Sequence, residues 1–275
     1  MSALLVLKFG GELLEDPARL ATVVGAVAAM TAQGTPVAIV HGGGKEIDAA
    51  LKVAGIPKQQ VEGLRITDDR TLDVVVSVLA GTINTRFVGA LTTAGVKAVG
   101  LTGADAACGL VDPAPPHRMV DGTQVDLQRV GIPADDADPA VVSLLADRGF
   151  VPVIACIGLG RDGRLYNVNA DTFAGHLAAR LGARRLTIAG TTAGVLDEAG
   201  VTVPMLDPAG IDALIASGTA TAGMIAKLRS CEQALAAGVH DVVIVDGLDG
   251  RALESAARSD APARATRLVP ATVKA

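Results

Sequence analysis

The sequence predicts an α/β fold with a mainly parallel central sheet flanked by helices. Half of the 275 residues are hydrophobic but only 2% are aromatic, so Val, Leu, Ile and Ala must build the core. Such a composition is typical of buried parallel strands covered by Ala-rich helices. Apolar runs also alternate with helical patterns along the chain, and this βαβα order favours parallel strands with right-handed crossovers.

The expected elements begin with a buried strand at residues 3–9. A helix is expected next, because Asp16 is a suitable N-cap, Pro17 fits the first turn and Gly34 can end the helix. The other expected strands lie at residues 36–44, 97–103 and 150–158, and the other expected helices at 45–55, 68–95, 139–149 and 172–183.

We expect two lobes of one continuous α/β unit, residues 1–170 and 171–275, because no linker-like tract interrupts the chain. The segment Asp112–Asp138 breaks the alternating pattern and is rich in Pro, Asp and Gly. A segment of this length forms either a hairpin or lid that covers a site, or a surface excursion without a role. The residues leave both interpretations open.

The charge and the cysteines of the chain indicate which partners it can bind and in which compartment it is found. The net charge of −5 and the lack of a long basic run argue against a nucleic-acid partner. The three cysteines are far apart and the four histidines have no metal-ligand spacing, so we expect free thiols in a reducing cytosol and no protein metal site. The chain reaches Lys8 too early for a signal peptide, and no apolar run approaches the ~20 residues of a membrane span. We therefore expect a cytoplasmic protein.

Two glycine-rich turns follow the first two expected strands. Lys8, Gly10 and Gly11 end the first strand, and Gly42–Gly44 end the second. Ligands of open α/β sheets bind beyond the carboxyl ends of strands, where bare backbone amides and a lysine suit a phosphate. The spacing is neither GxGxxG nor GxxxxGK(S/T), which disfavours a dinucleotide-binding oxidoreductase and a Walker-type nucleotidase. Each turn, taken alone, also has a simple structural explanation.

Two cations lie in places that suit an anionic ligand. Arg65 lies in a loop before the long helix expected at 68–95, for which Thr67 is a plausible N-cap, and a guanidinium binds a carboxylate through two hydrogen bonds. Lys227 is expected in the first turn of a helix, where its charge opposes the helix dipole and favours an anionic partner. Either residue, taken alone, is also compatible with a solvated surface position.

The stretch YNVNAD, residues 166–171, places three polar side chains in alternation. If it is extended, Asn167 and Asn169 point to one side, and Asp171 stands at the N-terminus of the next helix. Asp171 is then either a simple N-cap or an acid that holds lysines in place while the two amides contact a substrate.

Taken in order, the motifs KFGG, VHGGG, GLRIT, NVNAD and GMIAK resemble the amino acid kinase family, and the resemblance runs from Lys8 to about Gly247. Its most specific part is VEGLRITDDRTLDVVVSVLAGTIN together with NVNAD. This pair resembles the branch of the family that phosphorylates N-acetyl-L-glutamate. The lysines and glycines are shared more widely with carbamate, aspartate, uridylate and isopentenyl phosphate kinases.

The resemblance implies a three-layer αβα sandwich with an N-terminal acceptor lobe and a C-terminal ATP lobe. It implies phosphoryl transfer from ATP, with Mg²⁺ carried by the nucleotide, to the side-chain carboxylate of N-acetyl-L-glutamate in arginine biosynthesis. The implied catalytic residues are Lys8, Lys227 and Asp171, the implied acceptor-binding residues are Gly43, Gly44, Arg65, Asn167 and Asn169, and the implied ATP-binding residues are Gly10, Gly11, Gly190, Leu196, Gly223 and Met224. A carboxylate with a pKa of about 4.3 is already ionised at neutral pH, so the reaction requires no general base.

The resemblance is incomplete in the nucleotide lobe. Family members carry an acid at about Thr191 or Thr192, and a second Gly and a Pro before the position of Lys227. These departures leave open a non-catalytic protein that binds a small molecule or a partner on the same fold. The segment Asp112–Asp138 also keeps little of the family's hairpin pattern near the acceptor, so a kinase of N-succinylglutamate or N-acetyl-aminoadipate stays open as well. Arginine-inhibited members carry an extra N-terminal helix that assembles hexamers. Because the first strand here begins close to Met1, we expect a homodimer without arginine feedback.

Overall fold

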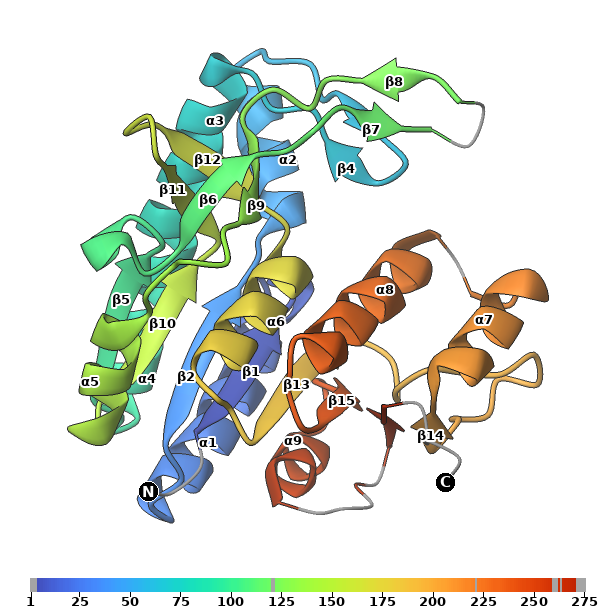
Figure 1. Cartoon of the computed structure of the whole chain (residues 1–275). Coiled ribbons are helices and arrows are strands. Elements are labelled where there is room, and N and C mark those ends of the chain that lie inside the picture. Colours follow the sequence, from blue (N-terminus) through green and yellow to red (C-terminus); the bar gives the residue numbers. More distant parts are fainter. Residues whose placement is uncertain (1–3, 120–121, 221, 259–261, 263, 271–275) are drawn as a thin grey trace.

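An eight-stranded sheet forms the centre of the molecule (Figure 1). The computed structural model describes residues 4–119, 122–220, 222–258, 262 and 264–270. The strand order is β14 (Met205–Leu206), β16 (Ala265–Leu268), β15 (Val242–Asp246), β13 (Arg185–Gly190), β1 (Leu5–Phe9), β2 (Val37–His41), β10 (Val151–Ala155) and β5 (Ala98–Thr102). Every neighbouring pair is parallel except β15 with β16. The expectation of a mainly parallel sheet is therefore confirmed.

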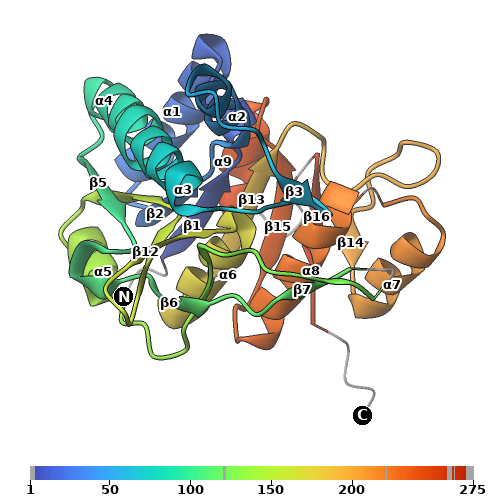
Figure 2. The same ribbon diagram turned by 90° about the horizontal axis from the view of Figure 1, so that it is seen from above.

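Helices cover both faces of this sheet, so the molecule has three layers (Figure 2). One face carries α1 (Pro17–Ala32), α3 (Asp69–Val76), α4 (Asn84–Thr93) and α9 (Gly250–Arg258), and the other carries α5 (Ala140–Asp147), α6 (Ala170–Arg180) and α8 (Ala222–Ala236). Two more helices, α2 (Gly44–Val53) and α7 (Pro208–Ala216), pack against α3 and β14 respectively. The αβα sandwich implied by the family resemblance is thus confirmed.

The signals at the ends of α1 act as expected. The Asp16 carboxylate accepts hydrogen bonds from the amides of Ala18 and Arg19, each at 3.0 Å, which satisfies two N–H groups that have no partner within the helix. Gly34 follows the helix with φ +76°, a conformation that favours glycine.

The long helix before β5 differs from the expectation in two ways. Asp68 rather than Thr67 is its N-cap, and the Asp68 carboxylate accepts the Thr71 amide at 2.7 Å. Its middle, Ser77–Ile83, is a π-helix that joins α3 to α4. By length and composition, Asp69–Thr93 is the one helix of the described residues that is able to cross a membrane, but here it packs against the sheet and its neighbouring helices.

The irregular segment Asp112–Asp138 forms paired strands, as the hairpin interpretation expected. A closed barrel contains β6 (Leu110–Pro113), β9 (Val130–Pro133), β11 (Ile157–Gly160) and β12 (Leu165–Val168), and the hairpin of β7 (His117–Arg118) and β8 (Gln124–Val125) projects from it (Figure 1). The single strand expected at 150–158 is wrong, because the chain leaves β10 at Cys156 and enters the barrel as β11. Periodicity cannot locate this break, since both strands are buried.

The register brings the polar ends of several strands to one edge of the sheet. Phe9, at the end of β1, lies opposite His41 of β2 and Ala189 of β13. Gly10, Gly42 and Gly190, which come directly after these three residues, therefore lie at the same end of neighbouring strands. Strands from before residue 170 form one half of the sheet and strands from after it form the other, and the halves meet where β1 pairs with β13.

Candidate active site

Three charged side chains from distant parts of the chain meet beyond the carboxyl end of β1. Lys8 Nζ lies 2.8 Å from one oxygen of Asp171, at the start of α6, and Lys227 Nζ, on α8, lies 3.6 Å from the other. The three side chains are only 9%, 15% and 18% exposed, for Lys8, Asp171 and Lys227 respectively. With both lysines protonated, this lysine–aspartate cluster carries one net positive charge, which suits an anionic ligand.

Burial and mutual attraction set the protonation of the cluster. Burial alone favours the neutral acid, but Lys8 and Lys227 outweigh it and hold the pKa of Asp171 below its usual value. Burial likewise opposes the charge of Lys8, yet Asp171 outweighs it and raises the Lys8 pKa. The pKa of Lys227 is lowered, first by burial and then by the positive charge of Lys8. Of the two lysines, Lys227 therefore loses its proton more readily than Lys8.

A pocket of about 260 Å³ collects the residues expected to bind the acceptor. Its lining comes from the loop after β2, the β3–β4 hairpin (Gln60–Val61 and Leu64–Arg65) and the end of β12. The sequence-predicted residues in it are Gly43, Gly44, Arg65, Asn167 and Asn169. Cys156 also lines it as a buried free thiol, whose pKa burial raises to about 12, so it stays protonated.

Arg65 is anchored on one side and open on the other. Its Nη2 pairs with the Asp48 carboxylate and donates to the Gly44 carbonyl at 3.4 Å. Its Nη1 is buried and has no hydrogen-bond partner among the described residues. A buried, unsatisfied guanidinium nitrogen is costly unless a ligand meets it, so Arg65 is suited to bind a carboxylate in this pocket.

The two asparagines have different partners. Asn167 Nδ2 donates to Thr67 Oγ1 at 3.3 Å. Asn169, not Asp171, is the N-cap of α6, and its Oδ1 accepts the amides of Asp171 at 2.9 Å and Thr172 at 3.1 Å. The simple capping interpretation of Asp171 is therefore wrong, and its carboxylate is free for the lysines. Within the Asn169 side chain, Oδ1 is thus engaged as the cap, and Nδ2 is the atom available to a ligand.

The two glycine turns touch each other. A Cβ on Gly11 would lie 2.6 Å from Gly43 Cα, and a Cβ on Gly43 would lie 2.1 Å from Ile83 Cδ1. No side chain fits in either place without displacement of its neighbours. Because α2 begins at Gly44, the first amides of this helix have no partner within it and can bind an anion.

The residues expected to bind ATP follow β1 and β13 and begin α8. Gly10 and Gly11 continue from Lys8, and Gly190 ends β13. Leu196 lies in the loop after β13 and is 37% exposed, and Gly223 and Met224 lie in the first turn of α8. The expectation of Lys227 in that first turn is wrong, because it is the sixth residue of α8. No contact between the described residues tests nucleotide binding, so these positions stay predictions.

Sequence reasoning missed the side chains that support the site. Asp48 lies one helical turn after Gly44, a spacing that places both on one face and was a usable signal. His41 and Asn84 are buried and hydrogen-bonded to each other, but they are 43 positions apart and no periodicity links them. Only the tertiary structure brings them together.

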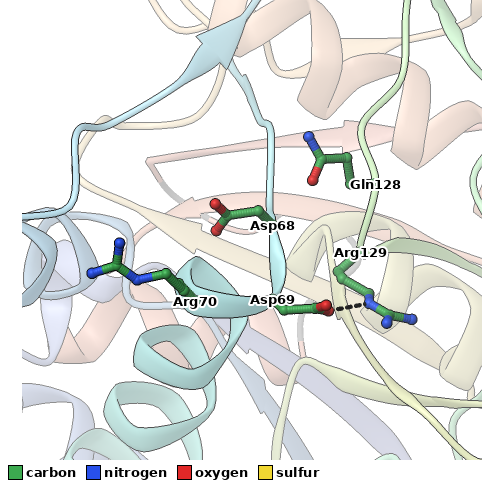
Figure 3. Close-up of a pocket in the computed structure, with 5 residues that line it drawn as sticks. All are labelled: Asp68, Asp69, Arg70, Gln128 and Arg129. Carbon is green, nitrogen blue, oxygen red and sulfur yellow. Dashed lines mark hydrogen bonds and ion pairs between the residues drawn. The ribbon is translucent and has the colours of Figure 1, made fainter.

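A second, larger hollow lies outside this pocket, at the start of α3. It measures about 440 Å³ and is lined by Asp68, Asp69, Arg70, Gln128 and Arg129 (Figure 3). Arg129 Nε donates to Asp69 at 2.6 Å. The backbone of Arg129 also donates to the Thr67 carbonyl at 2.8 Å and accepts the Asn167 amide at 2.9 Å. The backbone of Arg129 therefore links Thr67, which precedes α3, to Asn167 of β12, which lines the smaller pocket.

Comparison with known proteins agrees with this geometry. The model of the amino acid kinase family matches residues 3–246. An acetylglutamate kinase from Sphingopyxis alaskensis is 42% identical over 247 residues, which cover 88% of this chain and 81% of that protein. An acetylglutamate kinase from Delftia acidovorans is 41% identical over 246 residues, with 88% and 82% covered.

Solved structures share the fold. The N-acetylglutamate synthase from Neisseria gonorrhoeae superimposes with a TM-score of 0.81 at 23% identity, over 98% of this chain, although this chain spans only 59% of that one. Carbamate kinase from Giardia lamblia superimposes with a TM-score of 0.69 at 17% identity, over 98% of this chain and 100% of that one. The sequence match, the fold and the buried lysine–aspartate cluster agree, and the chain belongs to the amino acid kinase family.

Proposed function

We propose that this protein transfers the γ-phosphoryl group of ATP to the side-chain carboxylate of N-acetyl-L-glutamate, in the cytoplasm, as a step of arginine biosynthesis. The observation that carries the proposal is the lysine–aspartate cluster beside a pocket that contains a buried, unpaired guanidinium nitrogen. Relatives named acetylglutamate kinase, about 40% identical over 88% of the chain, support the choice of acceptor.

The acceptor is held at both ends in this proposal. Arg65 Nη1 and Asn167 bind its α-carboxylate, and the amides of Gly43 and Gly44 face the reacting end. The side-chain carboxylate attacks as an anion, so no proton has to be removed. One of its oxygens forms a bond to the γ-phosphorus while the bond from that phosphorus to the β–γ bridging oxygen breaks, and ADP leaves with the electron pair.

The charged cluster acts on the phosphoryl group during transfer. Lys8 and Lys227 stabilise the negative charge on its oxygens, and Asp171 keeps both ammonium groups in place. The nucleotide binds to the C-terminal lobe, residues 171–275, through Gly190, Leu196 and the first turn of α8. The Gly10–Gly11 loop of the N-terminal lobe contacts its phosphates. Mg²⁺, carried by the nucleotide, would supply further positive charge there.

An ATP-dependent hydroxamate assay tests the proposal, because hydroxylamine traps acyl phosphates. We expect hydroxamate from N-acetyl-L-glutamate and none from free glutamate. A stronger signal from N-succinylglutamate or N-acetyl-aminoadipate would reassign the acceptor. No signal from any of them, with folded protein and Mg²⁺ present, would favour the non-catalytic alternative.

Arg65→Ala is expected to raise the KM for the acceptor by about 10- to 100-fold, the loss of a charged hydrogen bond, with a smaller change in kcat. The reason is that Arg65 contacts the part of the acceptor that does not react. Lys58→Ala is the matched control, since Lys58 pairs with the same Asp48 at 2.7 Å but does not line the pocket. An unchanged KM in Arg65→Ala would remove Arg65 from acceptor binding.

We also propose a homodimer. Among the described residues, β5 ends the sheet with one edge unpaired. Phe150 precedes Val151, which pairs with Ala98 of β5, and is 37% exposed, while Leu144 on α5, which packs against β10, is 58% exposed. An open strand edge with nearby apolar side chains favours pairing with a second copy. Light scattering is expected to give twice the chain mass of 27.6 kDa. A monomer or a hexamer would contradict this.

A further inference from the structure

The glycine turn after β2 rests on two buried polar side chains that the proposed chemistry does not use. His41, the last residue of β2, is fully buried, and Asn84, the first residue of α4, is 5% exposed. Asn84 Nδ2 lies 3.0 Å from His41 Nε2 and donates to the Val153 carbonyl of β10 at 2.8 Å. His41 Nδ1 lies 3.3 Å from the Gly42 carbonyl.

The donors and acceptors in this chain of contacts follow from one another. The Val153 carbonyl can only accept, so the Asn84 amide nitrogen faces it, and the second N–H of that nitrogen is available to His41. His41 Nε2 must then accept, which places the ring proton on Nδ1, next to the Gly42 carbonyl. Burial lowers the His41 pKa to about 4, so the ring is neutral and this tautomer is the one present.

The hydrogen bond to Gly42 also orients the next amide. In a trans peptide the carbonyl of one residue and the N–H of the following residue point in opposite directions. With the Gly42 carbonyl turned to the buried imidazole, the Gly43 N–H turns away from it, and Gly43 lines the acceptor pocket.

Building on the proposed function, we propose that His41 and Asn84 are positioning residues that hold the Gly42–Gly43 peptide so that the Gly43 amide binds the reacting end of the acceptor. The π-helix Ser77–Ile83 supports the same Gly42–Gly43 peptide. It ends at Ile83, directly before Asn84, and two of its side chains, Leu79 and Ile83, occupy the space that a Cβ on Gly43 would need. π-Helical turns often occur at functional sites, and this one sets both contacts to the glycine turn.

A pair of variants separates the donor from the bulk of the ring. His41→Asn keeps an N–H near the position of Nδ1, whereas His41→Leu has a similar size and no donor. We expect kcat to fall about ten-fold in His41→Leu, with the acceptor KM within about two-fold of wild type, because the lost contact acts at the reacting end. His41→Asn is expected to keep most of the wild-type kcat. Thermal unfolding of both variants shows whether the fold is intact.

Asn84→Leu tests the second member of the pair. We expect it to lower kcat as His41→Leu does, and we expect the double variant to be no slower than either single variant, because the two residues act as one unit. An additive loss, a wild-type kcat in folded His41→Leu, or equal losses in His41→Asn and His41→Leu would overturn the proposal.

The ring tautomer is a readout that needs neither activity nor a variant. Nitrogen-15 NMR of wild-type protein is expected to show His41 neutral, with the proton on Nδ1 at neutral pH. A wild-type proton on Nε2, or a charged ring, would overturn the proposal even if both variants fail to fold. If the expected tautomer is seen but wild-type protein forms no hydroxamate, the proposed function fails, and the positioning proposal fails with it. If wild-type protein is active but has the other tautomer, only the positioning role of His41 and Asn84 is removed.

Discussion

Lys8→Met is expected to lower kcat by about 10²- to 10³-fold, a typical cost of removing one preorganised group that stabilises transition-state charge. Met keeps the apolar stem of a side chain that is only 9% exposed, so the packing at the end of β1 changes little. Asp171 retains Lys227 as a partner in this variant, which limits the destabilisation from a buried unpaired carboxylate. Hydroxamate formation under saturating acceptor and ATP measures the effect.

Lys45→Met is the matched control for this variant. Lys45 follows the glycine turn, but its side chain is 72% exposed and pairs with Glu15 at 3.3 Å, so its loss is expected to leave kcat unchanged. Wild-type turnover in folded Lys8→Met would place Lys8 outside the mechanism.

Asp171→Asn is expected to lower kcat by about 10²-fold or more, because the two lysines lose the charge that holds them together. Asn has nearly the same shape as Asp, so the fall in kcat measures the loss of the negative charge.

The variant is also expected to change the pH dependence of kcat. Asp171 raises the pKa of Lys8 in the wild type, so its removal lowers that pKa, and the pKa of Lys227 is already lowered by burial and by Lys8. The alkaline limb of the pH–kcat profile is therefore expected to move to lower pH.

Asp69→Asn is the control for the aspartate variant. Asp69 also pairs with a cation, Arg129, but its side chain is 78% exposed and lies outside the acceptor pocket. We expect an unchanged pH profile for Asp69→Asn. A profile of Asp171→Asn that keeps the wild-type alkaline limb would show that Asp171 does not set the protonation of the lysines.

Local signals in the sequence were sufficient where the physics is local. The helix at Pro17–Ala32 begins at a capping aspartate and a proline and is followed by a glycine with positive φ, all of which act over one turn. The glycine turns after β1 and β2 were also predictable, because each run of glycines directly follows a buried apolar strand in the sequence. Here the expectations and the structure agree.

Boundaries failed where two neighbouring residues compete for one role. Thr67 and Asp68 are both suitable N-caps, and Thr67 is instead fully buried and bonded to Asn167 and to the 127–129 segment. Asn169 likewise caps α6 ahead of Asp171. The π-helix has no signal in the sequence, because its side chains follow the same apolar pattern as an α-helix.

The sequence by itself determined the α/β class, and through the family resemblance it predicted which residues carry the chemistry of an amino acid kinase. The tertiary structure alone decided which of these residues lie together. Lys8, Asp171 and Lys227 are far apart in the chain, and they meet because β1 lies at the centre of the sheet with α6 and α8 packed on one face. The pairing of His41 with Asn84 has the same origin, since hydrogen bonds between buried groups depend on their separation in space, which no local pattern of residues records.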